Sequence, residues 1–366
     1  MKVALEKKTL VDMVLTVARA AARNTVIPIL GGLHMETKDG KLWFSATDME
    51  LGIRASTTEV EISEPGSVLV TAEHLASLAP KLINGVITIE TKDKLEVKHG
   101  RNKAKINLLE GDWPGLPSEE RVHRFTLPQD AIKTGLSQVA FAAASKHFRQ
   151  VFNGILVDIA DGVISFVASD THRLAVCEYP IEAENWQVVA PARTVVELLR
   201  ILKPEDGGTI TVSTVGNNLF FSWGDFEVSS ATISGDYPDY RSVIPSRESA
   251  VVLVKVDTGD MQSCINRLRV LPPDSKQGLL HTLLKIGSEN IVIQASSDSV
   301  GTVNEICSAE SSGENLEIAL NQKFLSDALS VMDQETKILF TGPETPAIVQ
   351  SRDNHQVILV PLRTHA

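Results

Sequence analysis

Apolar and polar positions follow a helical pattern at corresponding places in each third of this 366-residue chain. Apolar residues recur there at three- and four-residue spacing, which is typical of amphipathic helices, over residues 9–22, 129–144 and 258–271. Each stretch opens near an Asp or Thr, whose side-chain oxygen can accept a hydrogen bond from the free amides of a helix start. The pattern therefore predicts three capped helices.

A second amphipathic pattern follows an apolar strand in each third, at residues 70–82, 190–203 and 320–332. Between the two helices, a strand-like run ends in Ser or Thr, then Asp, and a further strand-like run follows. These segments are LWFSATDMELGIR (42–54), ISFVASDTHRLAV (164–176) and IVIQASSDSVGTV (291–303). Their aspartates, Asp48, Asp170 and Asp298, are 122 and 128 residues apart.

Two related segments, GDWPGLP (111–117) and GDYPDYR (235–241), lie 124 residues apart near the ends of the first two thirds. Four features thus recur at one period and in one order, as in a chain built from repeats of about 120 residues. We predict an α+β fold of three similar domains, each with antiparallel sheets and two helices. Their expected bounds are 1–119, 122–246 and 248–366, and the polar stretches that follow the two related segments, SEERVHR and PSRES, are expected to connect them.

Composition narrows the class of protein. Apolar residues make up 43% of the chain, enough for packed cores, and no apolar run approaches the roughly 18 residues of a membrane span. The N-terminus lacks the apolar core of a signal peptide. Three scattered cysteines are too few for a disulfide framework or a zinc site. We expect a reduced cytoplasmic protein with no membrane association, metal or cofactor.

The net charge and the absence of known catalytic motifs argue against several classes of function. The net charge of −11 argues against a DNA-binding surface spread over the exterior. There is no P-loop, HExxH or nucleotide-binding glycine motif, and no catalytic residue is predicted. The repeated aspartates more plausibly close local turns with their own backbone. A hydrolase centred on Asp170 and His172 remains an alternative, although no nucleophile motif accompanies His172.

Several segments resemble a known family. These are VIPILGGL (26–33), FNGILVDI (152–159), ASDTHRLAV (168–176), GDYPDYRSVIP (235–245) and VPLR (360–363). Over its full length, the chain resembles the bacterial sliding clamps, the β subunits of DNA polymerase III. The other interpretation of the repeats is a triplicated α+β scaffold that binds protein or carbohydrate and never contacts DNA.

The resemblance implies a head-to-tail homodimer whose six domains close a ring around double-stranded DNA, with helices inside and sheets outside. Such a ring is a processivity factor without catalytic activity. It tethers the polymerase α subunit, and it binds the clamp loader and other proteins that carry a clamp-binding motif. A closed ring holds DNA by topology, irrespective of sequence, so an acidic exterior is compatible with a mildly basic lining.

The family also implies three sets of site residues. The expected DNA-binding set, near the ends of the first helices, is Arg19, Arg23, Asn24, Lys146, Arg149 and Gln150. Cations there could instead complement helix dipoles. The expected dimer interface joins the strand at 103–109 to the partner's third domain, through Ile106, Leu108, Leu271 and Glu305.

The third set is a pocket for partner peptides between the second and third domains. Its expected walls are Phe152, Thr171, His172, Arg173, Leu174, Pro238, Ser242, Val243, Ile358, Val360, Pro361, Leu362 and Arg363. Arg173 and Arg363 are expected to place positive charge beside the apolar walls. Thr171 replaces a usual Gly, and Ser242 a usual Arg, so we expect an altered preference among peptides. The chain end is equally compatible with a strand that docks on its own domain.

Overall fold

The computed structural model describes residues 1–117, 120–204, 207–272, 281–297 and 299–362. The chain forms two compact units, each described here by itself. The first contains Met1–Ile132 and Arg193–Thr232, and the second contains Lys133–Ala192 and Ile233–Ala366. Because these units divide the expected second domain between them, the domain bounds 1–119, 122–246 and 248–366 stay a prediction.

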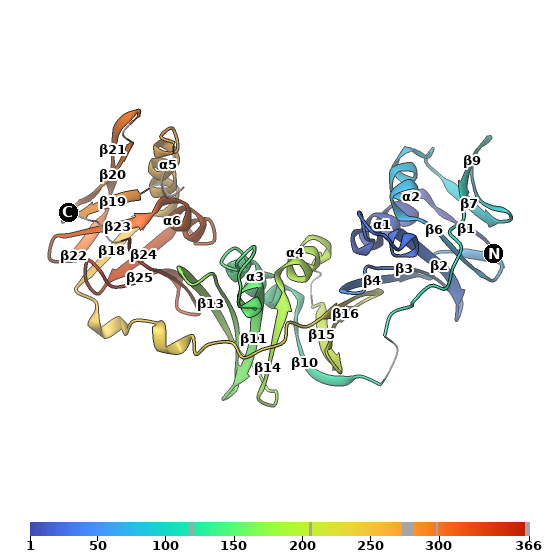
Figure 1. Cartoon of the computed structure of the whole chain (residues 1–366), viewed down its shortest axis with the longest axis horizontal. Coiled ribbons are helices and arrows are strands. Elements are labelled where there is room, and N and C mark those ends of the chain that lie inside the picture. The colour runs from blue at the N-terminus through green and yellow to red at the C-terminus, as the bar shows by residue number, and fades with distance from the viewer. Residues whose placement is uncertain (118–119, 205–206, 273–280, 298, 363–366) are drawn as a thin grey trace. The chain divides into compact units, whose positions relative to one another are not determined.

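The first unit contains two antiparallel sheets (Figure 1). One has the order β5 (Glu61–Glu64), β1 (Lys2–Glu6), β7 (Val86–Thr91), β8 (Lys94–His99) and β9 (Asn102–Asn107). The other has the order β10 (Val122–Pro128), β15 (Thr209–Val215), β16 (Asn218–Trp223), β17 (Phe226–Ala231), β4 (Leu51–Thr57), β3 (Lys41–Thr47), β2 (Gly32–Lys38) and β6 (Ser67–Thr71).

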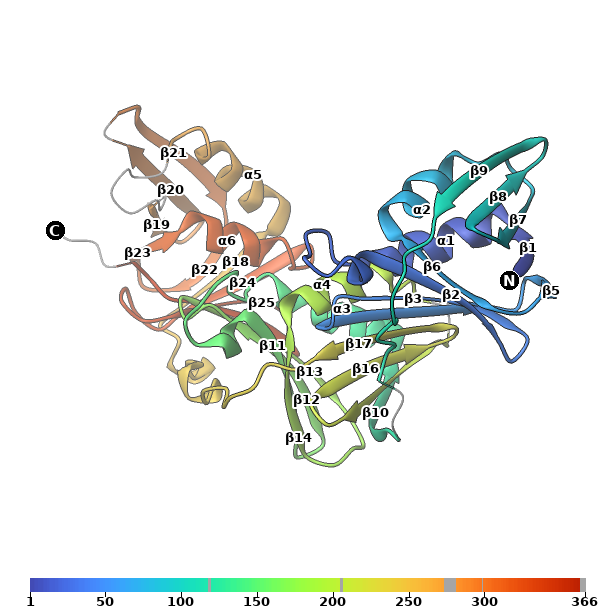
Figure 2. The same cartoon turned by 45° about the vertical axis from the view of Figure 1, so that its right-hand side comes forward.

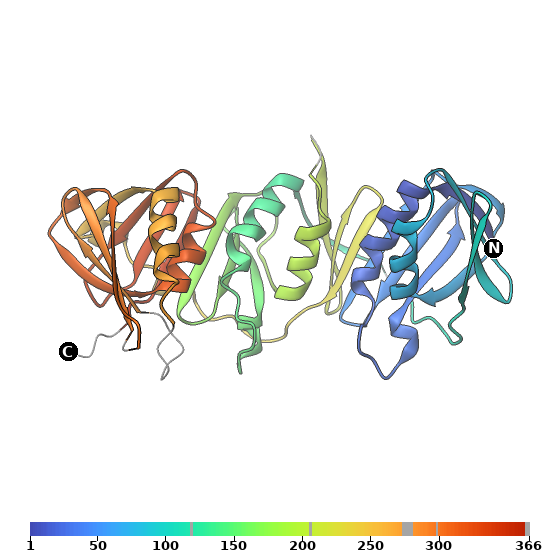
Figure 3. The same ribbon diagram turned by 90° about the horizontal axis from the view of Figure 1, so that it is seen from above.

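Two helices of this unit, α1 (Lys7–Val17) and α2 (Ala72–Leu78), lie side by side against strands of both sheets (Figure 3). Leu10, Met13, Val14 and Val17 form the buried stripe of α1, which confirms the predicted periodicity. A third helix, α4 (Ala192–Ile201), buries Thr194, Val195 and Leu198.

The second unit also has two antiparallel sheets (Figure 2). The larger has the order β14 (Trp186–Pro191), β11 (Gly154–Ala160), β12 (Val163–Ser169), β13 (Arg173–Pro180), β26 (His355–Leu359), β25 (Ala347–Arg352), β24 (Glu335–Phe340), β18 (Val252–Asp257) and β22 (Glu310–Gly313). The smaller has the order β21 (Gly301–Ser308), β20 (Asn290–Ser297), β19 (His281–Ile286) and β23 (Leu316–Asn321).

Three further helices complete the set, α3 (Gln129–Ala140), α5 (Thr258–Leu268) and α6 (Gln322–Leu329), and α5 packs against α6. The six predicted helices are therefore confirmed, but their caps only in part. The Asp257 side chain accepts a hydrogen bond from the Asp260 amide at the start of α5. Glu6 precedes α1 without a side-chain cap, because that helix begins two residues before Thr9. None of the helices described is long and apolar enough to cross a membrane.

The predicted repetition is visible in the backbone. In the turns at Asp39-Gly40 and Asp161-Gly162, all four residues have positive φ, as two-residue hairpin turns of the DG type require. Each turn joins the two strands that precede its repeated Asp. Corresponding turns in the first two repeats therefore adopt the same conformation.

Burial of His355 makes the stability of the second unit depend on pH. The side chain is fully buried, its Nε2 lies 3.2 Å from the Gln138 carbonyl oxygen, and burial lowers its pKa to about 4. The unfolded chain binds a proton on this residue below about pH 6.5, whereas the folded chain does so only near pH 4. The neutral folded form is therefore progressively disfavoured as the pH falls through this window.

We predict that this residue lowers the free energy of unfolding by about 3 kcal/mol between pH 6.5 and pH 4. Urea unfolding at a series of pH values should show a shallower pH dependence for His355→Gln than for the wild type. The matched control is His74→Gln, because His74 is exposed. Equal slopes for His355→Gln and the wild type would contradict the assignment.

Candidate binding pocket and strand edges

The repeated Asp residues organise two equivalent hairpin apexes. Asp48 Oδ1 accepts hydrogen bonds from the amides of Glu50 and Leu51, and Asp170 Oδ1 accepts them from His172 and Arg173. The turn-closing role is thus confirmed for both, while Asp298 lies outside the described residues. Because Asp170 binds the backbone amide of His172, this carboxylate is committed to the turn, which does not favour the hydrolase alternative.

One residue in each apex has strained backbone geometry. Met49 has φ of 79° and Thr171 has φ of 74°, in the left-handed region that non-glycine residues seldom occupy. Thr47 Oγ1 accepts from the Met49 amide, and Ser169 Oγ accepts from the Thr171 amide, in the same geometry. These hydrogen bonds hold the two residues at the tip of the hairpin, where each lines a pocket.

The second unit contains a mainly apolar pocket of about 540 Å³. Of the expected walls, eight line it: Phe152, Thr171, Arg173, Leu174, Pro238, Val243, Ile358 and Val360. Leu174 and Ile358 belong to the hydrophobic core beneath the pocket, together with Tyr240 from the GDYPDYR segment. The aromatic side chains of this segment therefore form part of the pocket and its base.

Four other expected walls do not line the pocket. His172 stacks on Phe324, and the Ser242 hydroxyl donates to the Asp239 carbonyl. Pro361 and Leu362 continue past the pocket, and the Leu362 amide donates to the Ala319 carbonyl of β23. This part of the chain end thus docks on its own domain, as one of the two interpretations anticipated. Arg363 lies outside the described residues.

Sequence reasoning missed an aromatic wall that precedes β11. The His147 ring contacts those of Phe148 and Phe152, and Phe152 contacts Tyr237 edge-on. Phe148 is 88% exposed, although it lines the pocket. The other lining residues that were missed are Arg149, Ser169, Asp239, Tyr240 and Pro346. Only the exposed aromatic beside a charged residue in HFR could have indicated this wall.

The Arg173 side chain is buried at the pocket wall and is hydrogen-bonded within its own chain. It is 5% exposed, and its guanidinium donates to Asp170 Oδ2 at 3.0 Å, Asp327 Oδ2 at 2.6 Å and the Phe141 carbonyl at 2.8 Å. It also lies over the Phe324 ring. These internal partners fix the guanidinium at the pocket wall, and the expectation that Arg173 supplies charge to a bound peptide stays a prediction.

The hydrogen bond from Arg173 also affects the pKa of the Asp327 carboxyl group. Burial alone would raise its pKa, but hydrogen bonds from Lys323 and Arg173 hold the pKa below its usual value. Arg173 joins the end of α3, the β12–β13 apex and α6 through three groups. It consequently positions the pocket wall that Thr171 and Leu174 form.

The residues expected to contact DNA have mixed surroundings. Arg23, Asn24, Lys146 and Gln150 are exposed in the segments that follow the first helices of repeats one and two. Arg19 instead pairs with Glu197 at 3.2 Å. Arg149 lines the pocket, and its guanidinium lies 5.7 Å from the centre of the Phe152 ring. Arg23 and Lys146 have no ion pair within the part of the chain that the structure describes.

The expected dimer residues are largely committed to their own chain. Ile106 is 9% exposed and Leu271 is 3% exposed, so both belong to internal cores. Little of either side chain is left exposed for a partner, and their place in the dimer interface stays a prediction. Leu108 is half-buried and bridges to Val70, while Glu305 pairs with Arg267 at 2.7 Å.

Two apolar side chains on or near strand β21 are exposed to solvent. Ile306 in β21 is 69% exposed, and Val270 just after α5 is 72% exposed. Strands β9 and β21 are each the last strand of their sheet among the described residues (Figure 2). An exposed apolar residue on an edge strand is typical of a covered surface in the functional assembly.

We predict that Arg173→Met lowers the free energy of unfolding by about 3–5 kcal/mol, because it leaves Asp170 and Asp327 without a buried partner. The double variant Arg173→Met/Asp327→Asn should recover part of this loss, since it also removes a half-buried carboxylate that retains only the exposed Lys323 as an ion-pair partner. Urea denaturation of both variants measures the effect. A single variant as stable as the wild type would contradict the positioning role.

Comparison with known proteins matches each third of the chain to one family. Models described as the N-terminal, central and C-terminal domains of the DNA polymerase III beta subunit match residues 1–117, 126–239 and 241–364. The Beta sliding clamp of Bacillus subtilis is 26% identical over the full length of both chains. That of Salmonella typhimurium is 28% identical and covers 99% of this chain and 100% of its own.

Solved structures agree along the whole chain. The sliding clamp of Bacillus subtilis has a TM-score of 0.91 at 26% identity, and the DNA polymerase III subunit beta of Pseudomonas aeruginosa has a TM-score of 0.92 at 25% identity. Each covers 100% of this chain and of its own. Because the three family models together match nearly the whole chain in domain order, the chain belongs to the DNA polymerase III beta subunit family, the beta sliding clamps.

Proposed function

We propose that two copies of this chain close head to tail into a ring of six domains that encircles double-stranded DNA. As a sliding clamp, the protein is an accessory processivity factor of DNA replication. The alternative of a protein- or carbohydrate-binding scaffold finds no support in the comparisons. The observation that carries the proposal is a strand junction that the chain makes twice and leaves open a third time.

The two junctions formed within the chain are alike. In the first, β17 pairs antiparallel with β4, and Val228 lies opposite Ile53. In the second, β26 pairs antiparallel with β13, and Val357 lies opposite Ala175. Ile53 and Ala175 each stand five residues after a repeated Asp. In both junctions the other strand follows a two-residue turn, which Trp223 and Phe226 close in one and Arg352 and His355 in the other.

The third repeat offers one half of such a junction, and the first repeat offers the other half. Strand β9 follows a two-residue turn that His99 and Asn102 close, so Ala104 corresponds to Val228 and Val357. In β21, Val303 stands five residues after Asp298 and corresponds to Ile53 and Ala175. We infer that β21 pairs with β9 of the partner subunit, and that two such junctions related by a two-fold axis close the ring.

The proposed DNA-facing surface consists of exposed polar residues after the first helices, chiefly Arg23, Asn24, Lys146 and Gln150. Arg19 contributes less, because Glu197 offsets its charge. Contacts of this type read the phosphate backbone and carry no sequence information. Few contacts also allow the ring to slide, since its topology rather than its affinity retains it.

The apolar pocket is the proposed docking site for the polymerase α subunit, the clamp loader and other proteins with a clamp-binding motif. Its aromatic wall and the buried Leu174 and Ile358 suit an extended peptide with Leu or Phe anchors. Arg149 is the proposed cation beside the anchors, because it is exposed at the pocket whereas Arg173 is internally paired. We expect the protein to meet these partners in the cytoplasm, where DNA replication takes place.

We predict that the protein, with a clamp loader, is retained on a nicked circular DNA and lost when that DNA is linearised, because a ring slides off free ends. Gel filtration of the DNA complexes measures retention. Arg23→Glu/Lys146→Glu should load less well at equal dimer content. The matched control is the exposed Lys38→Glu. Equal retention of wild-type protein before and after linearisation would contradict the ring.

We predict that Val243→Asp and Val360→Asp each weaken binding of a fluorescent Gln-Leu-x-Leu-Phe peptide by at least about tenfold, the equivalent of roughly 1.4 kcal/mol. Both residues are partly exposed in the pocket, at 57% and 42%, so the fold should tolerate a carboxylate there. Val251→Asp is the control, since Val251 is similarly exposed at 51% but outside the pocket. Wild-type affinity in both pocket variants would rule out this site.

A further inference from the structure

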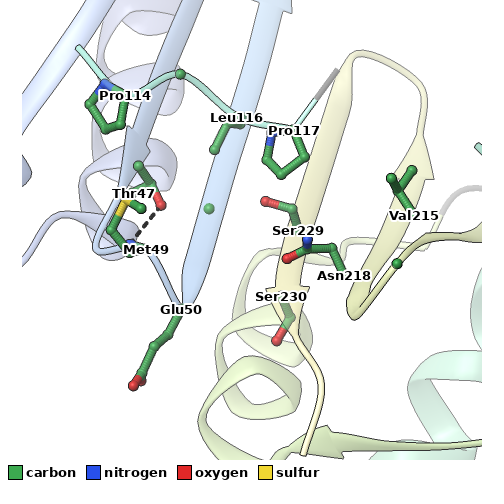
Figure 4. A pocket seen from close by; sticks show the side chains of 13 residues that line it. Thr47, Met49, Glu50, Pro114, Leu116, Pro117, Val215, Asn218, Ser229 and Ser230 are labelled. Carbon is green, nitrogen blue, oxygen red and sulfur yellow. Dashed lines mark hydrogen bonds between the residues drawn. The ribbon is translucent and has the colours of Figure 1, made fainter. Parts of the chain in front are cut away.

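The repeats produce a second pocket, in the first unit, that the proposed function does not use (Figure 4). It also has a volume of about 540 Å³. One wall is the β3–β4 apex, where Met49 takes the place of Thr171. Another is the GDWPGLP segment, which takes the place of GDYPDYR, and the strands β15, β16 and β17 complete it. We propose that this pocket is a separate docking site for a basic peptide segment of a partner protein.

The walls of this pocket approach each other closely where Leu116 and Ser229 meet at Gly52. A Cβ atom at Gly52 would lie 2.4 Å from both Leu116 Cδ2 and Ser229 Oγ, so the missing side chain at this position lets both of them approach the strand. Figure 4 shows Leu116 and Pro117 on one side of the pocket and Ser229 and Asn218 on the other. The site therefore offers an apolar surface for a side chain opposite polar groups for a peptide backbone.

The residues that line this pocket of the first unit differ in charge from those that line the apolar pocket of the second unit. Among the described residues, Glu50 is the one charged residue that lines the first unit's pocket, and it is exposed, whereas the other pocket is lined by Arg149, Arg173, Asp239 and His147. The Glu50 carboxylate extends away from the other labelled side chains in Figure 4. Within the part of the chain that the structure describes, Glu50 is engaged through its backbone, by the Asp48 side chain and the Ala231 amide. A ligand that enters here meets negative charge at the margin and polar groups inside, which favours Lys or Arg beside a small apolar anchor.

Met49 suits this role in a second way. Its side chain is 64% exposed at the hairpin tip, although its backbone is held rigidly by the Thr47 and Asp48 hydrogen bonds. A flexible thioether on a rigid support can adapt to different apolar anchors. The proposed ligand is thus an extended segment with a Leu-sized anchor against Met49 and Leu116 and a Lys near Glu50.

The test uses the full-length protein and a fluorescein-labelled nonapeptide with a central Leu flanked by Ser, and with Lys two positions away on each side. Fluorescence anisotropy should show saturable binding with a Kd of roughly 100 μM, and the same peptide with Glu for Lys should bind at least about tenfold more weakly. Trp113 directly precedes the lining residue Pro114, so its fluorescence should change with the same Kd, and this change should be absent in Trp113→Phe.

Variants then locate the site. Glu50→Lys should weaken binding by at least about tenfold, and Asn218→Ala by a smaller factor, while the exposed Glu61→Lys should leave it unchanged. Val243→Asp, in the other pocket, should also leave it unchanged. Three outcomes would overturn the proposal: no saturable binding up to about 1 mM, equal effects of Glu50→Lys and Glu61→Lys, or loss of binding in Val243→Asp. None of these readouts requires DNA, a clamp loader or ring closure.

Discussion

Backbone pairing between edge strands of neighbouring repeats is the interaction on which this molecule depends. Each junction satisfies the free amides and carbonyls of two edge strands at once, and main-chain pairing of this kind is indifferent to most side-chain changes. The same pairing register therefore persists where the side chains differ, as with Val228 opposite Ile53 and Val357 opposite Ala175. Three repeats satisfy two junctions internally, and we propose that a second copy supplies the third.

The same junctions create the pockets. Wherever β4 or β13 meets the strand of the next repeat, a strained hairpin apex and a Gly-Asp-aromatic-Pro segment meet beside it. The side chains that line the two pockets then make them chemically different. Arg173, Asp170 and Asp327 give the second unit a rigid apolar pocket, whereas Met49, Glu50 and Asn218 make the first unit's pocket more polar. One duplicated framework thus supports two different binding chemistries.

The fold could be predicted from the sequence because repetition multiplies weak signals. A single Asp-Gly turn or amphipathic stretch is common, but the same series at a period near 120 residues is not. The site was harder to predict, because long-range packing decides it. Arg173 looks like a free cation until Asp327, 154 residues later, is seen to pair with it. The resemblance places Ile106 and Leu271 at the dimer interface, and only the structure shows that their side chains also complete local cores.

The third junction is the central claim, and a cysteine pair tests it most directly. Residues opposite each other in an antiparallel pair lie about 4.5–5.5 Å apart at Cα, within the reach of a disulfide. Under mild oxidation, the variant Val303→Cys/Ala104→Cys should become a covalent dimer in non-reducing gel electrophoresis, while each single variant stays monomeric. A double variant that remains monomeric, or that forms cross-linked dimers no more than the single variants do, would contradict the account.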